Sequence, residues 1–341
     1  MRRKTFVAFV APSLVAMAAL IALPLLSVLA QSFFVTTEVM ETVVQKNCDP
    51  FGCKTEEVLA PVRGDDGRIV RATRWVGFDN YRALLQPDTV AAAFAAGGRG
   101  WAALANIDFY RALRFTLTFT LITLPLVLLV GLALALSVNR ALQSLRGPVI
   151  FVSLLPFIIT PLIGALSIRW LFIGDGILTA ALEWFLERDI ALFAQGWTIE
   201  VLMLFYRVWH VAPFAFVVFY AALQTVSQDA LEAALIDGAT RLQRLRYVII
   251  PHLAPLIVFV ALIHLMDAYR VFEEIIGFSA QAHRISLQWM TFDLLQPDDS
   301  GNRAIARASA SAMLTMVGVT LLLAPLLRRT WRDYGGGDSG R

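Results

Sequence analysis

Long apolar stretches recur along the chain and alternate with polar or charged segments. Each holds about 20 or more mostly apolar positions, and a helix of that length, rising about 1.5 Å per residue, crosses a hydrocarbon layer of about 30 Å. Such stretches are typical of membrane-spanning helices. The pattern therefore predicts six spans, at residues 6–30, 115–138, 149–173, 199–223, 253–276 and 306–327.

The composition of the chain indicates the same class. Of the 341 residues 58% are hydrophobic and 16% are charged, against about 45–50% and about 25% in soluble domains. Soluble, disordered, fibrous and disulfide-scaffold classes are excluded, and we predict an all-α, polytopic membrane protein. The first stretch contains Val28-Leu29-Ala30, which resembles a signal-peptide cleavage site. We nevertheless interpret it as an uncleaved span, because the apolar part of a signal peptide has only about 7–15 residues.

Arginines mark one side of the predicted topology. Those beside the spans are Arg2, Arg3, Arg140, Arg146, Arg241, Arg244, Arg246, Arg328, Arg329 and Arg332. Short loops rich in Lys and Arg face the cytoplasm, so both termini are predicted to be cytoplasmic. The predicted parts are the first span with its N-terminus (1–33), an extracytoplasmic loop (34–110), a core of five spans (111–327) and a cytoplasmic tail (328–341).

The chain has two cysteines, Cys48 and Cys53, in the sequence CDPFGC of the long loop. Their external placement in an oxidising compartment and the turn-like spacing predict a disulfide, the alternative being two unrelated thiols.

No catalytic or metal-binding motif is present. The nearest approach to a phosphate loop is Gly52-Cys53-Lys54-Thr55, which lacks the glycine directly before the lysine. The sequence has no Gly-x-Ser-x-Gly or His-Glu-x-x-His motif, and its four histidines are scattered. We therefore expect no catalytic residue, no metal site and no cofactor bound by this chain, and a membrane enzyme is disfavoured.

The loop at 224–250 is the most informative polar segment. Ser227 is a candidate N-cap, and Asp229 and Glu232 suit the positive start of a helix. Gly238 is expected to end that helix in a left-handed conformation. Thr240 and Gln243 have the spacing of a capping box for a second short helix. A short acidic helix lined with alanine, projecting from the cytoplasmic face, suits a cleft on a partner better than the membrane surface.

EAALIDGA at 232–239, followed by IIP at 249–251, resembles the EAA coupling motif of ATP-binding-cassette (ABC) importer permeases. WVGFDNYRALL (75–85), FYRALRFTLTF (109–119) and LLPF (154–157) are similar to segments of the maltose-type sugar permeases. Two features depart from the pattern of that family. Many relatives have a Gly-Gly-Gly-Pro stretch where this chain has YRVFEEIIGFSAQAHR, and loop 34–110 is longer than in compact members. The resemblance implies a type I permease core and ATPase-coupling residues Glu232, Ala233, Ala234, Asp237, Gly238 and Ala239.

Ionisable and aromatic residues lie within or beside the predicted spans. Such groups are costly in a membrane and often line a solute path, although they can also neutralise one another or bridge helices. Aromatic faces and bidentate hydrogen-bonding groups are what sugars require, while arginines could equally hold an anionic group on a modified sugar. Asp267, Arg270 and Glu274 have the spacing of neighbours on one helix. The candidate pathway residues are Arg169, Trp170, Tyr206, Arg207, Trp209, His210, Asp267, Tyr269, Arg270 and Glu274.

The resemblance thus implies the permease subunit of a binding-protein-dependent importer in a bacterial inner membrane, carrying a carbohydrate. The resemblance implies three partners besides the solute: a second permease, an ATPase dimer that binds ATP and Mg, and an extracytoplasmic solute-binding protein. Membrane lipid is a further expected partner because the predicted spans are apolar. Nucleic acid is not among them. Two alternatives stay open: an ion-coupled secondary transporter using His264 and Asp267, and an importer for amino acids or polyamines.

Overall fold

The computed structural model describes residues 3–49, 52–64, 67, 69–95, 100–174, 176–189, 191–298 and 302–335. The chain forms two compact units. Unit 1 comprises residues 1–95 and 291–314, and unit 2 comprises residues 96–290 and 315–341. Each unit is described by itself below.

Within the described residues, five helical segments are long and apolar enough to cross a membrane, and they overlap five of the six predicted spans. The first contains α1 (Arg3–Met17), a π-helical turn (Ala18–Ala22) and α2 (Leu23–Gln31). Helix α6 (Asp108–Arg140) corresponds to the second predicted span, and α10 (Gly196–Leu223) corresponds to the fourth. The fifth contains α12 (Arg241–Arg244), a π-helical turn (Leu245–Ile249) and α13 (Ile250–Ala268), and the last is α16 (Ile305–Gly335).

The third predicted span is not one continuous helix. It consists of α7 (Gln143–Ile158) and α8 (Pro161–Phe172), whose axes are bent by 96° at the break. Thr160 at the break is extended, as expected for a residue before proline, and Pro161 then opens the new helix. The predicted span 149–173 is therefore broken near Pro161, and apolar composition alone does not report such a break.

The fifth span begins and ends earlier than predicted. Helix α13 ends at Ala268, and the chain turns before α14 (Glu273–Gly277), so residues 253–276 are not one helix. The chain continues through a 3-10 turn (Ala280–Ala282) to α15 (Leu287–Asp293). Apolar residues extend through this turn because it is buried, as Val271 and Ile275 are, rather than because it is helical.

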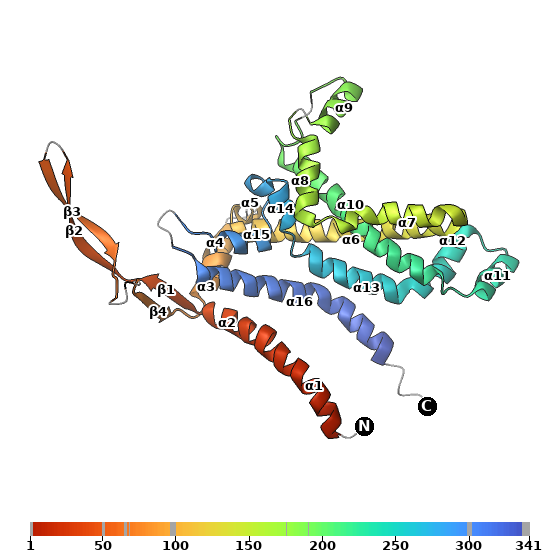
Figure 1. Cartoon of the computed structure of the whole chain (residues 1–341), viewed down its shortest axis with the longest axis horizontal. Helices are drawn as coiled ribbons and strands as arrows, with labels where there is room; N and C mark the ends of the chain where they lie inside the picture. The colour runs from red at the N-terminus through yellow and green to blue at the C-terminus, as the bar shows by residue number, and fades with distance from the viewer. Residues whose placement is uncertain are drawn as a thin grey trace. The chain divides into compact units, whose positions relative to one another are not determined.

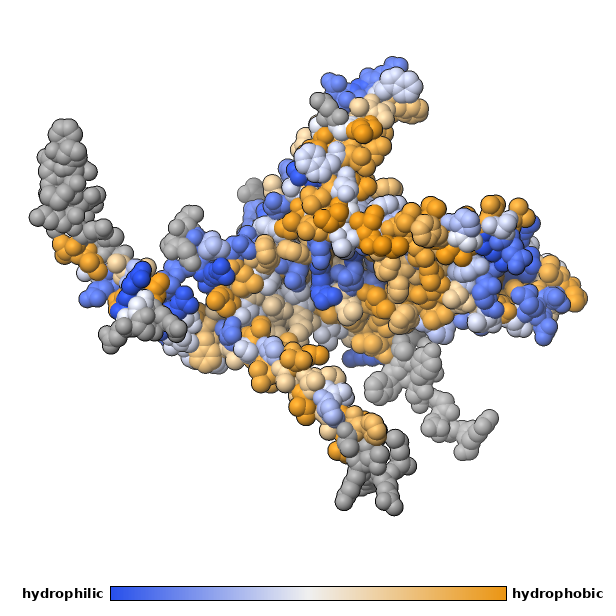
Figure 2. Space-filling view, in the orientation of Figure 1, coloured by the Kyte–Doolittle hydropathy of each residue, from blue (hydrophilic) through white to orange (hydrophobic). Residues whose placement is uncertain are grey.

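The core of unit 2 forms where α10 lies against α6, with α7 and α13 beside it (Figure 1). Gly131 permits the close crossing of α6 and α10, because a Cβ there would lie 2.6 Å from the Cβ of Ala215. Buried Val127, Phe216 and Phe219 pack at this crossing. Figure 2 shows apolar side chains gathered over α7 and hydrophilic ones around α12 and the neighbouring α11 (Gln228–Ile236). The unit thus has the surface expected of a bundle whose middle meets lipid. The short helices α5 (Gly100–Leu104) and α9 (Ile177–Leu186) complete it.

Unit 1 contains most of the predicted long loop, and that loop is structured. Strand β1 (Phe34–Glu38) pairs antiparallel with β4 (Arg71–Trp75), and β2 (Met40–Asp49) pairs antiparallel with β3 (Gly52–Pro61). Helices α3 (Asp79–Leu85) and α4 (Pro87–Ala95) follow. Asn80 is buried, and its side-chain amide donates to the carbonyl of Ser32 at 2.8 Å. This bond ties the loop to the end of the first span.

The two cysteines occupy opposite positions in the β2–β3 pairing. The side chains of Cys48 and Cys53 lie outside the part of the chain that the structure describes, so their disulfide stays a prediction.

Candidate functional site

The loop between the fourth and fifth spans has the local structure predicted for it. The hydroxyl of Ser227 accepts the backbone N–H of Ala230 at 3.3 Å and caps α11. The helix ends in a Schellman motif, in which the N–H of Gly238 bonds the carbonyl of Leu235 and that of Ala239 bonds the carbonyl of Ala234. Gly238 has φ +76°, so the left-handed conformation is present.

The second short helix of this loop also begins with the cap that the sequence predicts. Thr240 and Gln243 form both bonds of a capping box at the start of α12. The loop therefore holds two short helices whose ends are fixed by their own side chains and backbone.

Helix α11 presents both charge and apolar surface to its surroundings. Glu232 is exposed, and on the same helix Leu235 is 53% exposed and Ile236 86% exposed. Ala233 is also exposed and Ala234 half-buried, so small side chains leave the backbone accessible. An acidic group beside uncovered apolar residues on a rigid helix is an arrangement that a protein partner can cover. Sequence reasoning identified the acid and the alanines but not the two apolar residues.

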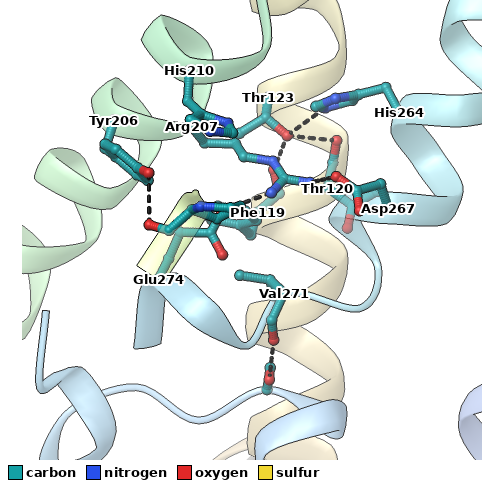
Figure 3. Close-up of polar contacts among 12 residues, drawn as sticks. Phe119, Thr120, Thr123, Tyr206, Arg207, His210, His264, Asp267, Val271 and Glu274 are labelled. Atoms are coloured by element: carbon teal, nitrogen blue, oxygen red, sulfur yellow. Dashed lines mark hydrogen bonds and ion pairs between the residues drawn. The ribbon is translucent and has the colours of Figure 1, made fainter. Parts of the chain in front are cut away.

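A second polar site is buried within unit 2, around Arg207 of α10. Its Nη1 donates to Oε1 of Glu274 in α14 at 2.6 Å, and its Nη2 donates to Oδ2 of Asp267 at the end of α13 (Figure 3). The side chains of Arg207 and Glu274 are 4% and 1% exposed, whereas that of Asp267 is 53% exposed. One arginine thus joins three helices, with one carboxylate in the core and the other reaching the surface.

This arrangement corrects the predicted contacts on the fifth span. Arg270 was expected to lie between Asp267 and Glu274 on one helical stripe, but the helix ends before it and Arg270 is exposed. The partner of both carboxylates is Arg207, from the fourth span. Spacing along one helix identifies possible neighbours only while the helix continues, and here it does not.

Two further residues of α10 bond the break between α7 and α8. The hydroxyl of Tyr206 donates to the carbonyl of Pro161 at 2.7 Å, and Nε2 of His210 lies 2.9 Å from the carbonyl oxygen of Ile159. Both side chains are buried. Backbone groups freed by a break inside a membrane need partners, and α10 supplies them. Gly164 leaves room for the tyrosine, since a Cβ there would lie 2.4 Å from its hydroxyl oxygen.

Buried threonines on α6 extend this polar cluster and were missed from the sequence. The hydroxyl of Thr123 lies 2.9 Å from Nε2 of His264, and that of Thr116 accepts the backbone N–H of Leu287 at 3.1 Å. Thr116, Thr120 and Thr123 recur at helical spacing in an otherwise apolar span, and that spacing was the available signal.

Several polar atoms of the cluster have no bond within the described chain. They are Nε of Arg207, Nδ1 of His210, Nδ1 of His264 and Oε2 of Glu274.

The remaining candidate pathway residues are distributed between the surface and the core. Trp170 and Trp209 are 69% and 37% exposed, and Arg169 is half-buried. Tyr269 is buried beside Gly318, where a Cβ would lie 2.0 Å from the tyrosine hydroxyl oxygen. Within the described ranges, no group of three or more His, Cys, Asp and Glu side chains is placed to hold a metal ion.

Comparison with known proteins places the chain in a family. Residues 104–329 match the binding-protein-dependent transport system inner membrane component family. The trehalose transport permease SugA of Mycobacterium tuberculosis is 30% identical over 204 residues, which are 59% of this chain and 63% of that protein. The trehalose/maltose permease MalF of Thermococcus litoralis is 27% identical over 175 residues, 50% of this chain and 58% of that one. The match thus spans about three fifths of these relatives' length.

The fold is also found in a solved structure. A chain from a bacterial ABC transporter involved in the import of the acidic polysaccharide alginate superposes with a TM-score of 0.68 at 19% identity, covering 98% of this chain and 97% of that one. These findings confirm the predicted fold class and the family resemblance. The chain is a member of the binding-protein-dependent transport system inner membrane component family.

Proposed function

We propose that this chain is the permease subunit of an ATP-driven importer that carries a carbohydrate into the cell. The observation that carries the proposal is the rigid acidic helix α11, which ends in a Schellman motif and exposes Glu232, Leu235 and Ile236. An ion-driven carrier has no use for such a docking element. Membership of a binding-protein-dependent transport family supports the same conclusion.

The partners follow from this function. A cytoplasmic ATPase dimer, which binds ATP and Mg, receives α11, and a second permease completes the path across the bilayer. An extracytoplasmic binding protein delivers the solute. The orientation is the one that the arginine distribution predicts, with both termini and α11 in the cytoplasm of a bacterial inner membrane.

A carbohydrate is the favoured solute because two relatives are named as permeases for trehalose, or for trehalose and maltose. The geometry divides the candidate pathway residues into two groups. Arg207, Glu274, Tyr206 and His210 are buried and bonded to the protein, so we assign them to holding the helices in place. Asp267, Trp209 and Trp170 keep exposed surface and are the better candidates for contact with the solute.

The coupling helix provides the test of this function. Glu232→Lys reverses the charge that we expect to accept a bond from a basic residue of the ATPase, a bond that contributes about 1.5–3 kcal/mol. Gly238→Val opposes the left-handed backbone at φ +76°. Both variants should insert normally, lose the co-purifying ATPase and lose ATP-driven uptake of labelled trehalose or maltose into vesicles. Gly238→Asn is the matched control, because asparagine tolerates this conformation.

Retention of the ATPase and of parental uptake by both variants would remove α11 from the coupling role. Uptake that needs no ATPase and stops when an ion gradient is collapsed would instead establish the secondary transporter.

A further inference from the structure

Unit 1 contains an open cavity of about 920 Å³ that the proposed function does not use. Its walls are the end of α2, the paired strands β1 and β4, Asn80 of α3 and the segment 302–307 that begins α16. Pockets that hold small molecules measure about 300–1,000 Å³. The cavity is therefore large enough for a ligand of the size of a short oligosaccharide or a lipid headgroup.

The cavity wall carries an excess of positive charge. Its charged side chains are Arg71, Arg303, Arg307 and Glu38. Nη2 of Arg71 lies 3.4 Å from Oε1 of Glu38, so these two charges offset each other. Arg303 and Arg307 are exposed, and neither forms an ion pair with a carboxylate in the described part of the chain. Two like charges four residues apart repel each other, and an anion bound between them would attract both and offset that repulsion.

The rest of the lining provides hydrogen-bonding groups and one aromatic face. Gln31 and the hydroxyls of Thr36 and Thr73, which lie 3.2 Å apart across the β1–β4 pair, border the cavity. Phe34 adds a ring that is 36% exposed. Hydroxyl and amide groups bind polyols, and arginine binds carboxylate or phosphate through paired N–H donors.

We propose that this cavity binds an anionic polyol, a molecule that carries a carboxylate or phosphate among hydroxyl groups. Two sources share this chemistry. One is an acidic oligosaccharide arriving from outside the cell, and the other is the phosphoglycerol headgroup of a membrane lipid, because α2 and α16 both belong to spans. The first source rests on the proposed transport of carbohydrates, and the second does not.

The test measures binding to the full chain in nanodiscs of phosphatidylcholine. Trigalacturonate is the anionic probe and maltotriose the neutral one, both titrated by calorimetry. Trigalacturonate should bind more tightly, and Arg303→Gln with Arg307→Gln should weaken that binding by about tenfold or more. Arg74→Gln is the matched control, because Arg74 is exposed on β4 but points away from the wall formed by Arg71 and Thr73. Its affinity should equal that of the parent.

The lipid arm uses nanodiscs that contain phosphatidylglycerol, with retained lipid identified by native mass spectrometry. Retention by the parent and Arg74→Gln, but not by the double variant, assigns the site to the headgroup, and competition with trigalacturonate shows that both ligands share it. The double variant must keep the parent's thermal stability. If neither ligand distinguishes it from the parent, the cavity is not an anion site. That failure would leave the proposed function intact, because ATP-driven uptake of a neutral sugar is measured separately.

Discussion

Arg207 bonds two carboxylates of very different exposure, and its removal should be costly. Arg207→Met would leave Glu274, only 1% exposed, without its counter-ion. Breaking a buried ion pair on one side destabilises a protein by about 3–5 kcal/mol. We expect this loss in denaturant unfolding of the detergent-solubilised chain, with partial recovery when Glu274→Gln is added. Arg270→Ala, in the exposed turn, should stay within about 0.5 kcal/mol of the parent. Equal stability of Arg207→Met and Arg270→Ala would contradict the assignment.

The sequence identified most of the ionisable residues of this cluster, but it did not predict which of them form ion pairs with each other. Ionisable side chains in apolar spans stand out by composition alone, so Arg207, Asp267 and Glu274 could be identified. Their pairing could not, because it depends on the end of α13 at Ala268 and on the packing of α10 against it. Thr123 was missed because a threonine in a membrane helix usually bonds the backbone of its own helix and so gives no sign of a second partner. Its hydroxyl does bond the carbonyl of Phe119 in the same helix.

At the scale of elements, the contact between α14 and α8 depends on a glycine. A Cβ at Gly277 would lie 2.4 Å from the Cβ of Ala165, so Gly277→Ala should push the two helices apart. Such overpacking costs about 1–3 kcal/mol. Gly147→Ala on α7 is the control, because its Cβ would meet nothing within 4 Å. The prediction is a lower melting temperature for the Gly277 variant alone, and equal melting temperatures would refute it.

Element ends were predictable where one residue decides them locally. The caps at Ser227 and Thr240 and the left-handed Gly238 follow from side chains that bond the adjacent backbone. A proline can kink or break a helix, but the residue type alone does not say which of the prolines in the predicted spans does so. Pro125 and Pro213 lie within the unbroken helices α6 and α10, whereas Pro161 begins a new helix. At this break Tyr206 and His210 of α10 bond the carbonyls of Pro161 and Ile159.

The β2–β3 hairpin gives the predicted disulfide a geometric basis. Opposite residues of antiparallel strands have Cα atoms about 4.5–5.5 Å apart, within the range of about 4.4–6.8 Å for disulfides. Cys48 and Cys53 are opposite in this register. In intact, unreduced membranes neither cysteine should react with a maleimide, and both should react after reduction. Ready labelling before reduction would show free thiols.

At the scale of the whole molecule, the bent pair α7–α8 decides the topology. Helix α7 has 16 residues, about 24 Å in length, and so falls short of a layer of about 30 Å unless α8 completes the crossing. If the pair crosses, the connection between α6 and α7, with Arg140 and Arg146, and the segment between α10 and α13, with Arg241 and Arg244, lie on the same side. If it re-enters instead, they lie on opposite sides, against the positive-inside rule. We therefore infer a complete crossing.

This inference can be tested with two single-cysteine variants made after replacing both native cysteines with serine. Val44 on β2 is 60% exposed and Ile236 on α11 is 86% exposed, so a cysteine at either position is open to reagent. Helices α6, α7–α8 and α10 lie between them in the sequence, and three crossings put the two positions on opposite sides. A membrane-impermeant maleimide should label Val44→Cys in intact spheroplasts and Ile236→Cys only in inverted vesicles. Labelling of both from the same side would mean that α7–α8 re-enters, and α11 could then not meet a cytoplasmic ATPase while the long loop faces outward.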